Sequence, residues 1–126
     1  MKFIPLCCAL LLTFLQPAFF EPALAHEAKG PNGGAMVDAG AFHVELTVKG
    51  QTVDVFVTDA SEKPVTIDGA KGTAILIVNG KPARVTLTAV SGNRLSGTAT
   101  ASLPATPKGA VQIQLPNGTS LQGKFH

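Results

Sequence analysis

The chain of 126 residues has no Trp, no Tyr and only two Cys, and no segment of it shows the apolar periodicity of a helix. Both cysteines, Cys7 and Cys8, lie at the extreme N-terminus, so the rest of the chain has no thiol. For that remainder, a disulfide scaffold, a thiol enzyme, a zinc module with Cys ligands and a blue-copper centre are all excluded. The remaining domain must therefore be stabilised by its apolar core.

The chain also lacks a strong excess of charge of either sign. Ten Lys and Arg residues against eight Asp and Glu residues give a net charge of +2, and the basic residues are scattered along the sequence. Beyond residue 25 the aromatic residues are Phe42, Phe56 and Phe125. A nucleic-acid interface needs a basic stripe or stacking aromatic side chains, so nucleic acid is not an expected partner.

The N-terminal 25 residues have the pattern of a signal peptide. Lys2 supplies a positive charge, residues 3–20 are almost entirely apolar, and Ala23-Leu24-Ala25 has the small-x-small pattern of a cleavage site. The apolar stretch is short, contains two prolines and has no stop-transfer charges after it, so we expect no membrane span after cleavage. Cleavage after Ala25 would leave 101 residues that begin with His26. The predicted location is periplasmic or secreted.

The rest of the sequence predicts a flexible lead-in over residues 26–34, followed by one β-domain over residues 35–126. The lead-in contains Gly30-Pro31-Asn32-Gly33-Gly34, which is rich in turn formers. Beyond it, apolar residues alternate with polar ones, and turn residues recur every 8–12 positions. The exception is the run Ala74–Val78, which is continuously apolar and predicts a strand covered on both faces. Strands are expected near residues 42–48, 53–58, 64–67, 74–78, 85–89, 94–101, 111–115 and 121–125.

This pattern predicts an all-β fold. The strand lengths and the turn spacing favour an antiparallel β-sandwich of seven to nine strands, immunoglobulin-like or cupredoxin-like in outline. The dipeptide Asn79-Gly80 is a strong signal for a two-residue hairpin turn.

The first hairpin carries the candidate metal ligands. A two-residue turn at Lys49-Gly50 would set Glu45 opposite Asp54, with His43 on the same face. Two carboxylates that face each other repel unless a cation lies between them, and imidazole with carboxylates suits Zn²⁺ or Cu²⁺. A four-residue turn would instead set Phe56 opposite Glu45. All three polar side chains are also compatible with a simple solvated strand face.

His26 is a candidate ligand for a different reason. Signal cleavage would give it a free α-amine, and the amine and imidazole of one residue can chelate a single metal ion. His43 or His126 would supply a second imidazole. Met36 fits a core filler better than a Cu⁺ ligand, and His126 fits a frayed terminus better than a ligand.

An enzyme is not expected. The sequence has no Gly-x-Ser-x-Gly elbow, no phosphate-binding loop and no dinucleotide-binding glycine pattern.

Some of these motifs resemble a known family. The segments His26…Gly30-Pro31-Asn32-Gly33-Gly34, Phe42-His43-Val44-Glu45-Leu46 and Val55-Phe56-Val57-Thr58-Asp59 resemble small exported β-domains. They are also similar to the N-terminal segments of periplasmic adaptor subunits of heavy-metal efflux pumps. A weaker likeness, carried by His26 alone, is to periplasmic copper-binding β-sandwich proteins that begin with His. The resemblance implies a role in binding or transferring metal ions.

Two functional hypotheses follow. The first is a non-enzymatic periplasmic metal-binding or metal-handover domain for heavy-metal efflux or resistance. Its metal would be copper, with zinc as the alternative, its ligands would come from His26, His43, Glu45 and Asp54, and its partner would be an efflux adaptor or another exported protein. The second is an exported interaction module that binds no metal and docks through a sheet edge or a loop.

Overall fold

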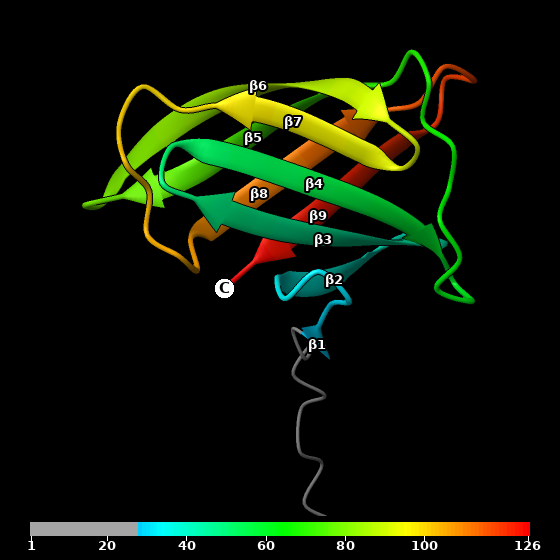
Figure 1. Cartoon of the computed structure of the whole chain (residues 1–126), viewed down its shortest axis with the longest axis horizontal. Coiled ribbons are helices and arrows are strands. Elements are labelled where there is room, and N and C mark those ends of the chain that lie inside the picture. Colours follow the sequence, from blue (N-terminus) through cyan, green and yellow to red (C-terminus); the bar gives the residue numbers. More distant parts are fainter. Residues whose placement is uncertain (1–27) are drawn as a thin grey trace, which may run out of the picture.

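The computed structural model describes residues 28–126, and every regular element in this range is a β-strand (Figure 1). All pairings are antiparallel and form one continuous sheet in the order β1-β2-β3-β4-β7-β6-β5-β8-β9. The all-β, antiparallel prediction is therefore confirmed. The strands are β1 (Ala28–Lys29), β2 (Ala35–Ala39), β3 (Phe42–Lys49), β4 (Thr52–Asp59), β5 (Lys71–Val78), β6 (Lys81–Ser91), β7 (Arg94–Thr98), β8 (Lys108–Gln114) and β9 (Ser120–Phe125).

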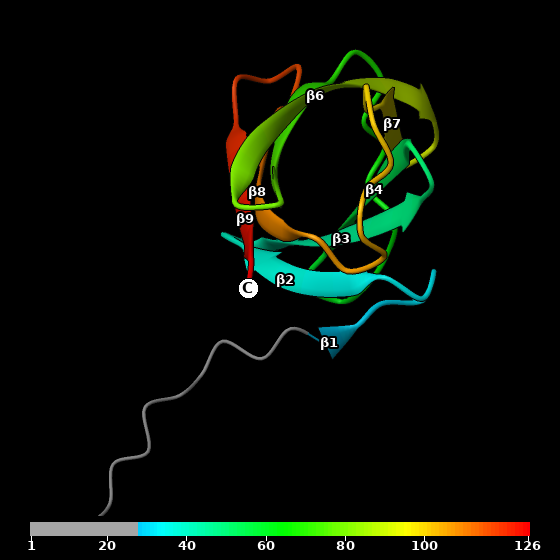
Figure 2. The ribbon, with the colours of Figure 1, turned by 90° about the vertical axis from the view of Figure 1, so that its left-hand side faces the viewer.

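The sheet curls into a half-barrel, so that β9 comes to lie beside β2 (Figure 2). No hydrogen-bonded ladder joins these two strands in residues 28–126, where β1 and β9 are the ends of the sheet order. Gly123 on β9 permits the close approach, because an added Cβ would lie 2.9 Å from a methyl group of Val37 on β2. The expected sandwich of two stacked sheets is not confirmed, since one curled sheet encloses the core.

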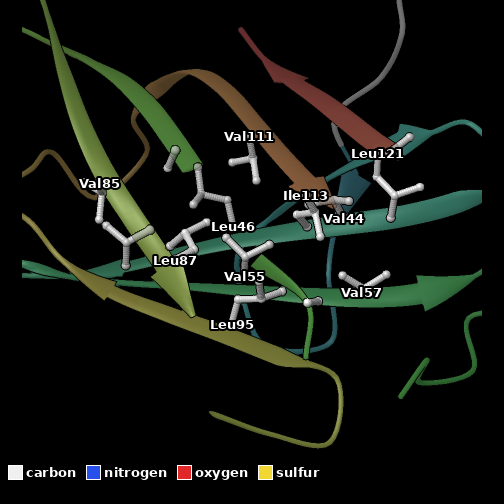
Figure 3. Close-up of a cluster of buried hydrophobic side chains, with 14 of the residues drawn as sticks. Val44, Leu46, Val55, Val57, Val85, Leu87, Leu95, Val111, Ile113 and Leu121 are labelled. Carbon is white, nitrogen blue, oxygen red and sulfur yellow. The ribbon is translucent and has the colours of Figure 1, made fainter. Parts of the chain in front are cut away.

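The core consists of the inward-facing residues of the alternating strands. Val44 on β3 and Val55 on β4 are fully buried, as are Leu87 on β6 and Leu95 on β7. Figure 3 shows these side chains meeting inside the curl with Val111 and others from the far side of the sheet. Period-two alternation places every second residue on one face, and that face is removed from water here.

Two-residue turns set several of the registers. Asn79 and Gly80, with φ of 52° and 75°, connect β5 to β6 and confirm the predicted hairpin. Gly50 and Gln51 connect β3 to β4, with Lys49 opposite Thr52. The predicted turn at Lys49-Gly50 is therefore wrong by one residue. The positive φ of Gly50, 61°, explains why the glycine occupies the first central position of the turn.

Three further predictions need correction. Residues 64–67 form no strand but make an isolated bridge from Pro64 to Thr58. The run Ala74–Val78 is covered on one face only, and its Ile77 is 41% exposed. The lead-in is, from residue 28 onward, attached to the sheet through β1 and the turn that follows it. The buried carboxylate of Glu45 holds this turn against the sheet by accepting N–H groups of Asn32 and Gly34.

No helix long and apolar enough to cross a membrane occurs within residues 28–126.

Candidate functional site

His43 lies on the outer face of the curled sheet, in a row of three polar residues on three adjacent strands. It is opposite Asp38 on β2 and opposite Thr58 on β4. The two-residue turn of Gly40 and Ala41 sets this register, because it pairs Ala39 with Phe42 and makes Asp38 and His43 the second pair of the hairpin.

The His43 imidazole and the Asp38 carboxylate are in direct contact. Nε2 of His43 lies 3.1 Å from Oδ1 of Asp38, and the two side chains are 22% and 87% exposed. The Asp38 side of the pair is thus open to solvent. An imidazole nitrogen and a carboxylate oxygen side by side can form an ion pair or supply two ligands to one metal ion.

The other ring nitrogen of His43 is shielded from solvent. Nδ1 is buried and has no hydrogen-bond partner among the described residues, and the same is true of the hydroxyl of Thr58. Thr58 is 7% exposed. Two unpartnered polar atoms therefore sit on residues that face each other across adjacent strands.

Glu45, two residues along β3, is also on the outer face but is only 2% exposed. The Gly-rich turn between β1 and β2 folds over its carboxylate. The backbone N–H of Asn32 donates to the carboxylate at 2.9 Å, the amide Nδ2 of Asn32 at 2.9 Å, and the N–H of Gly34 at 2.8 Å. Gly30 lies so close that a Cβ there would overlap the carboxylate carbon.

This arrangement explains the sequence motif of the lead-in. Gly30 is small because it contacts Glu45, and Gly34 is small because a Cβ would overlap the carbonyl oxygen of Leu46. The turn closes on itself through the N–H of Gly30 to the carbonyl of Gly34 at 2.8 Å. Turn composition alone predicts flexibility, whereas the buried carboxylate organises the turn by accepting its N–H groups.

The predicted convergence of His43, Glu45 and Asp54 does not occur. Glu45 is opposite Phe56, as in the alternative register, and Asp54 is opposite Thr47. The prediction that Glu45 faces Asp54 is wrong because the turn is Gly50-Gln51, one residue later than expected, which moves the partner of every β3 residue by two positions. Within residues 28–126, no group of three His, Cys, Asp or Glu side chains is placed to hold a metal ion.

Asp54 instead has a basic neighbour. Its Oδ1 lies 3.9 Å from a guanidinium nitrogen of Arg94 on β7, and its side chain is 17% exposed. Asp54 is thus placed for an ion pair within the sheet, one strand away from His43 and at the other end of the β3–β4 ladder.

The remaining histidines lie elsewhere. His26 is outside the described residues. His126 lines a hollow with Asn32, Lys49 and Lys108. His43 does not line this hollow. The structure therefore does not bring His126 and His43 together in one site.

Asp38 and Thr58 are the residues that sequence reasoning missed. The signal for Asp38 was present: Gly40 follows Val37-Asp38-Ala39 and precedes the alternating strand, which is a short hairpin pattern. Nothing in the sequence pointed to Thr58, because its relevance depends on the register of β4 against β3.

Comparisons of the chain with protein-family models, curated proteins and solved structures show no match. The class of protein is therefore defined by the fold and the outer-face residues: a single-sheet antiparallel β-domain with a His–Asp pair on its outer face.

Proposed function

We propose that this chain is an exported, non-enzymatic metal-binding domain, with His43 and Asp38 as the fixed half of its metal site. The observation that carries the proposal is the 3.1 Å contact between Nε2 of His43 and Oδ1 of Asp38 on an accessible face. Copper is the proposed metal, with zinc as the alternative, because imidazole with carboxylate suits both.

The spacing of the two atoms fits a shared metal ion. Ligand bonds to imidazole nitrogen and carboxylate oxygen are about 2.0–2.2 Å long. Two such bonds to atoms 3.1 Å apart enclose an angle of about 90–100° at the metal, at or a little above the square-planar value. The pair can therefore bind an ion without moving its strands.

Two protein ligands bind a metal ion only weakly. We propose that the imidazole and the α-amine of His26 supply the other ligands. The ladder between β1 and β2 sets Ala28 opposite Met36 and Lys29 opposite Ala35. His26 is two residues before Ala28 in the sequence and lies outside the described residues. Cleavage after Ala25 would then offer the imidazole and the free α-amine of His26 to an ion held by Asp38 and His43.

Glu45 and Asp54 have supporting roles in this proposal. The carboxylate of Glu45 is occupied by N–H donors from Asn32 and Gly34, and it holds the chain just after β1 against the sheet. Asp54 lies near Arg94, away from the pair. We therefore assign neither of these two carboxylates to the metal, in contrast to the ligand set expected from sequence.

The proposed setting is the periplasm, and the proposed role is metal handover in efflux or resistance. The signal-peptide pattern over residues 1–25 and the resemblance to adaptor segments of heavy-metal efflux pumps support this setting. An efflux adaptor or another exported protein would be the partner. A site with one face open to solvent suits an ion that must be passed on.

The test is a Cu²⁺ titration followed by electron paramagnetic resonance on residues 26–126, which contain all nine strands of the sheet. One version begins at His26 with a free amine, and a second carries one extra residue in front. We expect one-to-one binding tighter than micromolar with nitrogen hyperfine structure, weakened at least about tenfold by the extra residue and by His43→Ala.

Asp54→Asn is the matched control and should bind as the wild type does. Equal binding by the two versions would remove His26 from the site. Binding weaker than micromolar by both would overturn the metal function and leave the exported interaction module as the function to test.

A further inference from the structure

Nδ1 of His43 and Oγ1 of Thr58 are both buried and both without a hydrogen-bond partner among residues 28–126. The two residues face each other across β3 and β4. Directly opposite residues of an antiparallel pair have Cβ atoms about 4.5–5.5 Å apart. The hydroxyl of Thr58 is therefore the unpartnered side-chain group that lies directly across the ladder from the His43 ring.

The state of the imidazole without metal follows from Asp38. A carboxylate only accepts hydrogen bonds, so the ring nitrogen that contacts it, Nε2, carries a hydrogen. In a neutral ring, Nδ1 then has a bare lone pair. The Thr58 hydroxyl is the group opposite that can donate to it.

Binding of a metal at Nε2 reverses this arrangement. The ion takes the lone pair of Nε2. The hydrogen on that nitrogen passes to solvent and Nδ1 takes one up from solvent, so the ring stays neutral with its one hydrogen on Nδ1. This hydrogen then needs an acceptor in a buried position. A threonine hydroxyl is suited to both states, because it donates or accepts according to how its O–H is turned.

We propose that Thr58 is the positioning residue of the metal site: its hydroxyl accepts a hydrogen bond from Nδ1–H of His43 when Nε2 binds the ion. This inference rests on the proposed function. Metal-bound histidines ordinarily donate their second ring N–H to such a partner, which fixes the orientation of the ring. Thr58 acts through His43 and does not touch the metal.

The first measurement is the affinity of residues 26–126 for Cu²⁺ and for Zn²⁺ in four versions: wild type, Thr58→Val, Thr58→Ser and Thr47→Val. Valine keeps the shape of threonine and removes the hydroxyl. Loss of such an outer partner weakens metal binding about 10–100-fold, which is the result expected for Thr58→Val. Thr58→Ser should stay within about threefold of the wild type, because serine keeps the hydroxyl that accepts from Nδ1–H of His43.

Thr47→Val is the matched control, because Thr47 is half-buried on the same face of β3 and opposite Asp54. It should bind as the wild type does. Thermal unfolding of the metal-free proteins separates binding from folding. Thr58→Val removes at most the one hydrogen bond between the hydroxyl and Nδ1 of His43, so the variant should still unfold cooperatively, well above the temperature at which metal affinity is measured.

The second measurement is the ¹H–¹⁵N correlation spectrum of the histidine rings. In the metal-free wild type, His43 should carry its hydrogen on Nε2, and with Zn²⁺ it should carry it on Nδ1. A Zn²⁺-bound His43 that keeps its hydrogen on Nε2 would overturn the inference, because the metal would then be on the other nitrogen.

The outcomes separate the two proposals. If the wild type binds neither ion, the proposed function fails and this inference fails with it. If the wild type binds and Thr58→Val binds equally well, or if Thr58→Ser is as weak as Thr58→Val, the role of the hydroxyl is refuted while the metal site stands.

Discussion

Glu45 and His43 lie on the same face of β3 but differ in how far their polar atoms are hydrogen-bonded. Glu45 is covered by the Gly-rich turn, and three N–H groups donate to its carboxylate. His43, two residues earlier, has one nitrogen against an exposed carboxylate, and its other nitrogen has no partner within residues 28–126. A satisfied buried group rigidifies a structure, whereas an unsatisfied one is available for further chemistry. The comparison supports a structural role for Glu45 and is the basis for proposing His43 as a metal ligand.

The largest expected effect comes from Glu45→Ala. The substitution removes an acceptor of three N–H donors and leaves the donors of Asn32 and Gly34 without their partner. Hydrogen bonds to a charged group contribute about 1.5–3 kcal/mol each, so we expect a loss of at least about 3 kcal/mol in the free energy of unfolding. Urea denaturation measures this loss.

Asp54→Ala is the control for this prediction. It should lower the free energy of unfolding by less than about 1.5 kcal/mol, because the 3.9 Å between Asp54 Oδ1 and the Arg94 guanidinium makes a weak ion pair. A loss at Glu45 as small as the control's would refute the structural role of the carboxylate.

The next effect in size comes from Gly30→Ala. The new Cβ would overlap the carboxylate of Glu45, so the turn must move away from the sheet at a cost of about 1–3 kcal/mol. The cost should fall when Glu45 is first shortened to Asp, because the carboxylate then withdraws from Gly30. A double-mutant cycle of Gly30→Ala with Glu45→Asp checks this by chemical denaturation. Additive effects of the two substitutions would contradict the contact.

The smallest effect on stability comes from Asp38→Asn. The Asp38 side chain is 87% exposed, so we expect the free energy of unfolding to change by less than about 0.5 kcal/mol. The affinity for Cu²⁺ should nevertheless fall about tenfold by our own estimate, since an amide oxygen is a weaker ligand than a carboxylate for a divalent cation, and ligand type governs metal preference. Isothermal titration calorimetry with thermal unfolding separates the two quantities. A drop in stability with unchanged affinity would make the pair a structural ion pair instead.

Several features of the fold could be predicted because they depend on neighbouring residues alone. Alternation in residues 42–48 and 53–58 assigned those strands and their inner faces, and Asn79-Gly80 assigned a hairpin turn. The short strands β1 and β2 were missed, because strands of two and five residues carry too little alternation to stand out. The run Ala74–Val78 was wrongly predicted to be covered on both faces. Its apolar outer-face residues suggested a second covering layer, but Ile77 is 41% exposed.

The candidate site was predicted less well than the fold. His43 and Glu45 were correctly expected on one face, but Asp54 was paired with the wrong residue. One residue of difference in the turn moved Asp54 from Glu45 to Thr47 and brought Thr58 opposite His43. An error of one residue in a hairpin turn changes every predicted pair, because all pairs along the two strands shift together.

The sequence by itself determined that the chain forms antiparallel strands with one buried face, since alternation and turn residues act over a few neighbouring positions. Only the tertiary structure decided that the strands form one curled sheet and that a Gly-rich turn closes over Glu45. It alone set Asp38, His43 and Thr58 in a row. These features depend on contacts between residues distant in sequence, and no local pattern encodes which side chain will cover, or face, another.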